Sequence, residues 1–141
     1  MSHINYRSLK KYKYQLMRNY KYETGICINH DVKIQGFVAL APTGTLNISK
    51  GYAWDGPSGP TIDTKNFMRG SLVHDALYQL MRLKLLPASL RETADMLLRR
   101  ICIEDDMYRL RAWYVYWCVR LFASAAATRP QTGDTQIIEA P

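Results

Sequence analysis

The first half of the chain alternates between apolar and polar residues, a pattern typical of half-buried β-strands. The alternation starts at Lys11, and one continuous stretch of it runs from Val32 to Leu40. It is interrupted where Asn, Asp, Pro and Gly cluster, because these residues favour turns. We therefore predict a small antiparallel sheet over about residues 11–50, with one face that needs cover.

In the second half the apolar positions recur every three to four residues, which predicts helices. We expect three of them, over about residues 66–83, 89–103 and 106–127. The second helix is expected to begin with a capping box, in which Ser89 and Glu92 satisfy each other's backbone amides. Acidic residues just before the third helix favour its start, because they complement the helix dipole.

The order of the elements, strands first and helices afterwards, is that of an α+β fold. At 141 residues the chain has the length of one domain and can bury a core without disulfides. We expect a single α+β domain over residues 1–129. Residues 130–141 are polar and lack periodicity, so we expect a mobile C-terminal tail there.

Positive charge is concentrated near the start of the chain. The formal net charge is +7, and residues 1–22 carry six basic side chains, no acidic side chain and five of the ten tyrosines. Interleaved basic and aromatic side chains could bind a nucleic-acid backbone and stack on bases. The same pattern fits a strand with tyrosines on the core face and with Lys11 and Lys13 in water. Both interpretations stay open.

The cysteines and the apolar runs bear on the class of protein. Cys27, Cys102 and Cys118 are widely spaced and form no CxxC pair, which argues against a disulfide framework or a zinc site and for a reducing compartment. No run of 18 apolar residues occurs, so we expect no transmembrane segment. The first residues lack the apolar core of a signal peptide, so secretion by that route is not expected.

Ionisable residues cluster in a turn-rich loop at residues 51–64 and in the helix that follows it. His74 and Tyr78 are four residues apart and share a helix face. Asp75 projects about 100° away, toward a different neighbour. An antiparallel return of the next helix would bring its carboxylate beside them. The predicted polar cluster contains Asp55, Asp63, His74, Asp75, Tyr78 and Asp95.

Two kinds of role fit this cluster. A divalent metal held by His74, Asp95 and either Asp63 or Asp55 would leave a position for water and would serve a hydrolase, with Tyr78 orienting the reacting group. A His–Asp pair could also act as acid and base without a metal. In the structural role no cofactor is needed, because the imidazole donates to Asp95 or Asp75 and the loop carboxylates bind turn amides.

The third predicted helix is apolar nearly all round, and arginines interrupt it. Such a helix is central to the core, pressed against a partner, or inserted at a membrane interface. Clustered Trp, Tyr and Arg are the residue types that dominate protein-binding hot spots. The candidate partner-binding residues are Trp113, Tyr116, Trp117, Arg120, Lys11 and Lys13.

Four motifs occur in order along the chain: Tyr-x-Trp-Asp-Gly-Pro-Ser-Gly-Pro-Thr-x-Asp at 52–63, His-Asp-Ala-Leu-Tyr at 74–78, Ala-Asp at 94–95 and Arg-Ala-Trp-x-x-Tyr at 111–116. Together they resemble a family of small proteins of tailed bacteriophages and prophages, known as domain of unknown function thirteen fifty-three. The resemblance extends over most of the chain and implies a phage origin and a compact domain, but no activity. It implies that the signature polar positions are Asp55, His74, Asp75, Tyr78 and Asp95.

We therefore expect a phage-encoded accessory or virion-associated protein, located in the host cytoplasm or in the virion. It would act by binding other phage proteins, a second copy of itself or nucleic acid, with the polar cluster as a structural element. The alternative is a metal-dependent hydrolase that uses His74 and the acidic residues around it.

Overall fold

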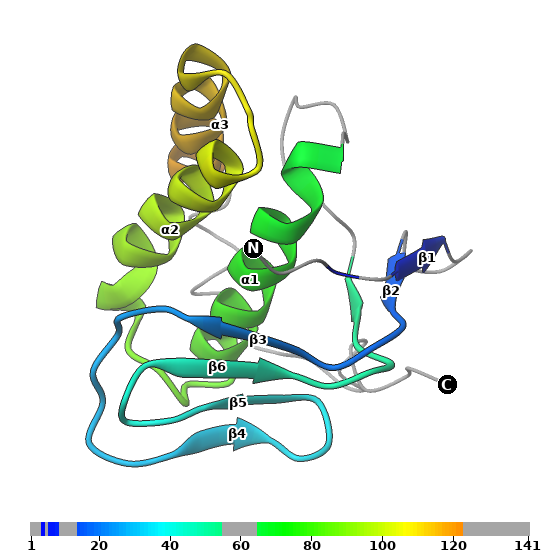
Figure 1. Cartoon of the computed structure of the whole chain (residues 1–141). Helices are drawn as coiled ribbons and strands as arrows, with labels where there is room; N and C mark the ends of the chain where they lie inside the picture. The colour runs from blue at the N-terminus through cyan, green and yellow to red at the C-terminus, as the bar shows by residue number, and fades with distance from the viewer. Residues whose placement is uncertain (1–3, 5, 9–13, 55–64, 123–141) are drawn as a thin grey trace. The chain divides into compact units, whose positions relative to one another are not determined.

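The computed structural model describes residue 4 and residues 6–8, 14–54 and 65–122 (Figure 1). These residues belong to two compact units: a strand unit, which holds all the strands, and a helix unit, which holds all the helices. Strands followed by helices confirm the α+β class. The single domain over residues 1–129 stays a prediction, and the tail at 130–141 lies outside the described residues.

In its described part the strand unit has seven short strands in two antiparallel sheets (Figure 1). One sheet has the order β1-β2-β7, and the other has the order β3-β6-β5-β4. The strands are β1 (Tyr6–Ser8), β2 (Tyr14–Leu16), β3 (Tyr20–Glu23), β4 (Val32–Ile34), β5 (Val38–Leu40), β6 (Thr45–Ile48) and β7 (Ala53–Trp54).

The sequence predicted one sheet over residues 11–50, and the structure corrects this to two sheets that also include β1 and β7. The stretch from Val32 to Leu40 is a hairpin rather than one strand. Gly36 lies in its turn with a φ of +82°, a left-handed conformation that glycine adopts without strain. Apolar residues recur at every second position on both sides of the turn, so the alternation alone did not reveal it.

Paired apolar side chains form the core of the four-stranded sheet. Val38 lies opposite Ile48, and Leu40 lies opposite Leu46, and all four side chains are buried. Between them, Asn47 on β6 is exposed. This is the alternation that the sequence predicted, and cross-strand pairs of this kind stabilise a sheet.

In the helix unit, the described residues form three α-helices and one short 3₁₀ turn (Figure 1). They are α1 (Lys65–Arg82), η1 (Ala88–Leu90), α2 (Arg91–Glu104) and α3 (Arg109–Phe122). The first helix agrees with the predicted 66–83 to within one residue. The predicted end of the third helix at 127 lies outside the described residues. No helix in the described part of the chain is long and apolar enough to cross a membrane.

Two predicted helix starts are corrected. The helix expected over 89–103 begins at Arg91, after the 3₁₀ turn, and its N-cap residue Leu90 makes no side-chain capping bond. The capping box that the sequence predicted is therefore not the start of α2. The helix expected from 106 begins at Arg109, because Asp106 adopts a left-handed φ of +69° that separates α2 from α3.

Helix α2 packs against both α1 and α3. The contact with α1 is close at Gly70, where an added Cβ atom would lie 2.8 Å from Cδ1 of Leu98 and 3.2 Å from Sγ of Cys102. The absence of a side chain at Gly70 lets the two helices approach at this point. Cys102 and Cys118 are buried, as expected for small core residues.

Candidate functional site

The candidate site is a buried polar cluster centred on the carboxylate of Asp95 in α2. Nε2 of His74 lies 2.7 Å from Oδ1 of Asp95, and the Tyr78 hydroxyl donates to the same oxygen across 2.5 Å. His74 and Tyr78 lie on one face of α1, and their rings are 4.1 Å apart between centroids. The side chain of Asp95 has 0% exposure, and those of His74 and Tyr78 are also buried.

A third helix completes the cluster. Nη1 of Arg120 in α3 lies 3.0 Å from Oδ2 of Asp95, so both oxygens of the carboxylate are bonded. Arg91 in turn donates to the backbone carbonyl of Arg120 across 3.4 Å. One carboxylate therefore ties α1, α2 and α3 together. Arginine fits this position because its several N–H donors can serve a carboxylate and remain partly hydrated.

Asp75 lies closer to the cluster than the sequence predicted. Its Oδ1 atom is 3.8 Å from Nδ1 of His74, which is an ion-pair distance but too long for a hydrogen bond. Burial alone lowers the pKa of His74, but the carboxylates of Asp75 and Asp95 attract its proton, and the net pKa lies above the ordinary 6.5. The cluster therefore favours the imidazolium form of His74.

The other two members of the cluster hold complementary protonation states. Burial alone raises the pKa of Asp95, but the bonds from His74, Tyr78 and Arg120 outweigh it and hold this pKa below the ordinary 3.8. Burial and the neighbouring Asp95 carboxylate raise the pKa of the Tyr78 hydroxyl. The arrangement is thus an ionised carboxylate that accepts from three donors, His74, Tyr78 and Arg120.

The described residues include two of the predicted metal ligands, His74 and Asp95. Within residues 6–8, 14–54 and 65–122, no group of three His, Cys, Asp or Glu side chains could hold a metal ion. Zinc binds nitrogen and oxygen at about 2 Å each, so an ion between His74 and Asp95 would force apart two atoms that now share a hydrogen bond. Of the predicted ligands, Asp63 lies outside the described residues.

Several other predicted residues also lie outside the described part of the chain. They include Asp55 of the loop and the two basic residues Lys11 and Lys13. The helix residues of the cluster are brought together, and Asp95 is bonded to His74 in α1 and to Arg120 in α3.

Sequence reasoning did not place Arg120 in the cluster, since it assigned this residue to partner binding. One signal was present: a buried carboxylate has two oxygens that need several donors, and α3 supplies three arginines and no acid. That signal limits the choice to Arg109, Arg111 and Arg120. The helix crossing that selects Arg120 cannot be read from one sequence.

A second ion-pair cluster joins α1 to the end of α2. Nε of the buried Arg69 lies 3.0 Å from Oδ2 of Asp105, and its Nη2 lies 2.8 Å from Oε1 of Glu104. Burial raises the pKa of the neighbouring Cys102 to about 12, so this thiol is not a nucleophile near neutral pH. These residues fasten two helices and carry no reactive group.

The outward face of α3 is unusually apolar. Of the candidate partner-binding residues, Trp113 is 52% exposed and Trp117 is 45% exposed, whereas Tyr116 is only partly exposed. Large apolar residues on this face and directly before the helix are exposed as well. They are Tyr108, Leu110, Tyr114 and Leu121.

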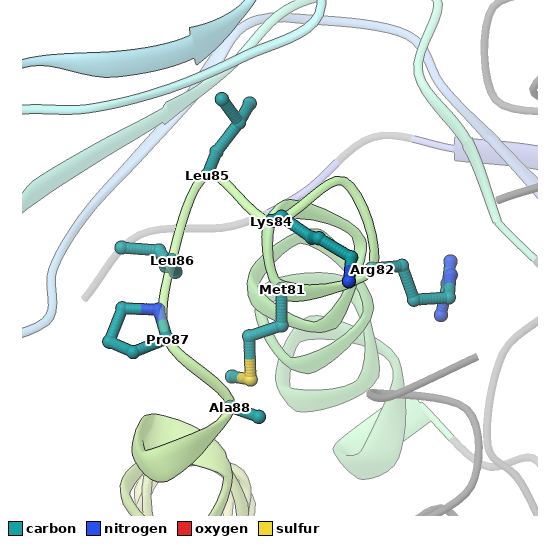
Figure 2. Close-up of a pocket in the computed structure, with 7 residues that line it drawn as sticks. All are labelled: Met81, Arg82, Lys84, Leu85, Leu86, Pro87 and Ala88. Carbon is teal, nitrogen blue, oxygen red and sulfur yellow. The ribbon is translucent and has the colours of Figure 1, made fainter. Parts of the chain in front are cut away.

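A shallow pocket lies where α1 ends and the chain turns toward η1. Figure 2 shows Met81 extending toward Ala88 across the bend, with Leu86 and Pro87 on the connecting segment. The lining residues all come from the segment 81–88, and none of them belongs to the Asp95 cluster. It offers no set of converging polar groups for a substrate.

Comparisons with protein-family models, with curated proteins and with solved structures find no match to this chain. The resemblance to the bacteriophage family stays a prediction.

Proposed function

We propose that this chain is a phage-encoded accessory or virion-associated protein that acts by binding a protein partner, another phage protein or a second copy of itself, through the outward face of α3. The cluster around Asp95 then has a structural role. The observation that carries the proposal is a contrast within one unit: the ionisable groups are buried and bonded to one another, while large aromatic side chains are left in water. The phage origin rests on the sequence motifs alone.

A structural role for the cluster follows from its bonding. His74, Tyr78 and Arg120 all direct their donors at one carboxylate. A catalytic acid or base needs a lone pair or a proton aimed at a substrate, but here Nε2 of His74 is bonded to Asp95 and both side chains are buried. A metal-dependent hydrolase, the alternative, would require the Asp95 oxygen that binds the metal to compete with the donors it now accepts from.

A binding role for α3 follows from its exposed residues. Monomeric proteins rarely leave contiguous apolar patches of this kind uncovered, and such patches mark sites of interaction. Tryptophan, tyrosine and arginine are the residues that contribute most to protein interfaces, and α3 contains all three types. Burying Trp113 and Trp117 against a partner would remove a large apolar area from water.

Site-specific photo-crosslinking tests this proposal. A photo-reactive phenylalanine analogue replaces Trp117 in one variant and Met96 in a control, in cells that carry the phage genome. Met96 is 55% exposed but lies on α2. We expect a discrete crosslinked protein at position 117 and none at position 96. Absence of a product at 117, or the same products at both positions, would contradict a partner site on α3.

A further inference from the structure

Four exposed residues form a seam along the outward side of α3. They are Leu110, Tyr114, Trp117 and Leu121, with exposed fractions of 79%, 47%, 45% and 69%. The opposite side of the same helix is buried, with Ala112, Val115 and Val119 at 1% or less. The seam residues are separated by four, three and four positions, and this is the spacing with which one helix packs against another in a coiled coil.

The seam reads the same in both directions. Its 4-3-4 spacing is unchanged when the order of residues is reversed, and a leucine stands at each end with an aromatic pair between them. A two-fold interface requires a patch that is complementary to itself. Turning a second α3 end over end would place Leu110 opposite Leu121 of the other copy and Tyr114 opposite Trp117 of the other copy.

We propose that the partner of α3 is a second copy of this chain, and that the two α3 helices pair antiparallel about a two-fold axis near residues 115 and 116. The proposal rests on the proposed function, because it names the occupant of the same face. Antiparallel pairing sets the two helix dipoles in opposite directions, which is the favourable arrangement. Tyr114 and Trp117 then pack as aromatic pairs across the axis.

The size of the exposed face suits a dimer. Six large apolar side chains on or beside α3 are at least 45% exposed. If each buries on the order of 100 Å², one copy contributes roughly 600 Å², not far below the ~800 Å² per partner of a standard interface. Arg120 lies beside the seam, but its charge is already paired with Asp95 at 3.0 Å, which reduces repulsion between the copies.

Complementary charges at the two ends of the seam test both the dimer and its direction. Leu110→Glu is made in one chain and Leu121→Lys in another. Each variant alone places two charges against leucine and is expected to be a monomer of 16.3 kDa by light scattering, whereas the wild type has twice that mass. Mixed in equal amounts, the variants are expected to regain the double mass, because the antiparallel dimer then has one Glu–Lys pair and one Leu–Leu pair.

The control is Met96→Glu, an acid placed at an exposed apolar position on α2, which is expected to leave the dimer intact. Circular dichroism checks that each variant keeps its helices. If either variant loses its helices, the facing pair Tyr114→Glu and Trp117→Lys is tested in its place. The mixture regains the mass of a dimer only if position 110 of one copy meets position 121 of the other. A mixture that stays monomeric therefore overturns the antiparallel pairing.

A wild-type chain that remains monomeric at its highest soluble concentration overturns the dimer. Binding of that monomer to vesicles of anionic lipid would show a membrane surface as the occupant instead. A crosslink at Trp117 to a different protein, with a monomeric chain, would overturn this inference and leave the proposed function standing. A crosslinked product of twice the chain mass supports both the proposed function and the dimer.

Discussion

Nε2 of His74 donates to Oδ1 of Asp95 across 2.7 Å, and this bond joins α1 to α2 inside the helix unit. Because Arg120 reaches the other oxygen of the same carboxylate, α3 is fixed through Asp95 as well. The seam residues lie on the side of α3 that faces away from its buried residues Ala112, Val115 and Val119. The cluster therefore sets the position of the helix whose outer face we propose as the dimer interface.

Replacing Asp95 by asparagine is expected to lower the free energy of unfolding by about 3–5 kcal/mol. The amide keeps the size of the side chain, but it leaves the buried His74 and the partly exposed Arg120 without their counterion. Urea denaturation followed by circular dichroism measures the change. The control is Glu92→Gln on the same helix, which is expected to change stability by no more than about 0.5 kcal/mol. A loss below 1 kcal/mol for Asp95→Asn would show that the cluster does not hold the helices together.

Replacing Tyr78 by phenylalanine is expected to cost about 1.5–3 kcal/mol, the range for a hydrogen bond to a charged group. The ring of Tyr78 and its packing on His74 remain, so the loss comes from the hydroxyl and its bond to Asp95. The double variant with Asp95→Asn separates the bond from other effects. If the two losses simply add, Tyr78 and Asp95 do not stabilise each other through this contact.

The pH dependence of stability follows from the two shifted pKa values. The folded His74 has a pKa above 6.5, so it holds its proton more tightly than the unfolded chain does. Its contribution is complete below pH 6.5 and is lost as the pH rises through the folded pKa. The folded Asp95 has a pKa below 3.8, so its contribution is complete above that pH and is lost as the pH falls through the folded value.

We therefore expect the free energy of unfolding to be highest between about pH 4 and 6.5 and to fall on both sides of that window. Thermal or urea unfolding, measured at pH values below, within and above this window, gives the profile. The His74→Gln variant is expected to lose the decline above pH 6.5, whereas His30→Gln, at an exposed position in the strand unit, should keep it. An identical decline in His74→Gln would assign the effect to another group.

The sequence alone predicted the positions of the helices and strands that have a clear local hydrophobic periodicity. The helical stripe of α1 and the alternation around Leu46 and Ile48 predicted a helix and a strand close to where they occur. The turn at Gly36 was hidden because apolar residues kept their two-residue period through it. The start of α2 was misplaced because a capping box is a local pattern, and here the chain forms a 3₁₀ turn first.

In the candidate site, the contacts that could be predicted are those within one helix and those between helices that follow each other in the chain. The four-residue spacing of His74 and Tyr78 placed them on one face, and the short connection brought Asp95 beside them. Arg120 could not be predicted, since its contact depends on how α3 crosses α2 over 25 residues of chain. Arg69 was missed for the same reason, because its partners are 35 and 36 residues away.

Gly70 in α1 provides a last test, in which two effects oppose each other. Alanine is the better helix former by about 1 kcal/mol, so Gly70→Ala would stabilise an isolated helix. Here the new Cβ atom would lie 2.8 Å from Cδ1 of Leu98 and 3.3 Å from its backbone oxygen, and overpacking of a core costs typically 1–3 kcal/mol.

The backbone oxygen belongs to α2 and cannot move without shifting that helix, so the steric cost is expected to win. We predict a net loss of about 1 kcal/mol for Gly70→Ala in urea denaturation. Leu98→Ala removes the nearest atoms and serves as the background for a second measurement, in which Gly70→Ala should be neutral or stabilising. A stabilising Gly70→Ala in the wild-type chain would mean that α1 and α2 can separate without cost, and the shared carboxylate at Asp95 would then have to tolerate the same movement.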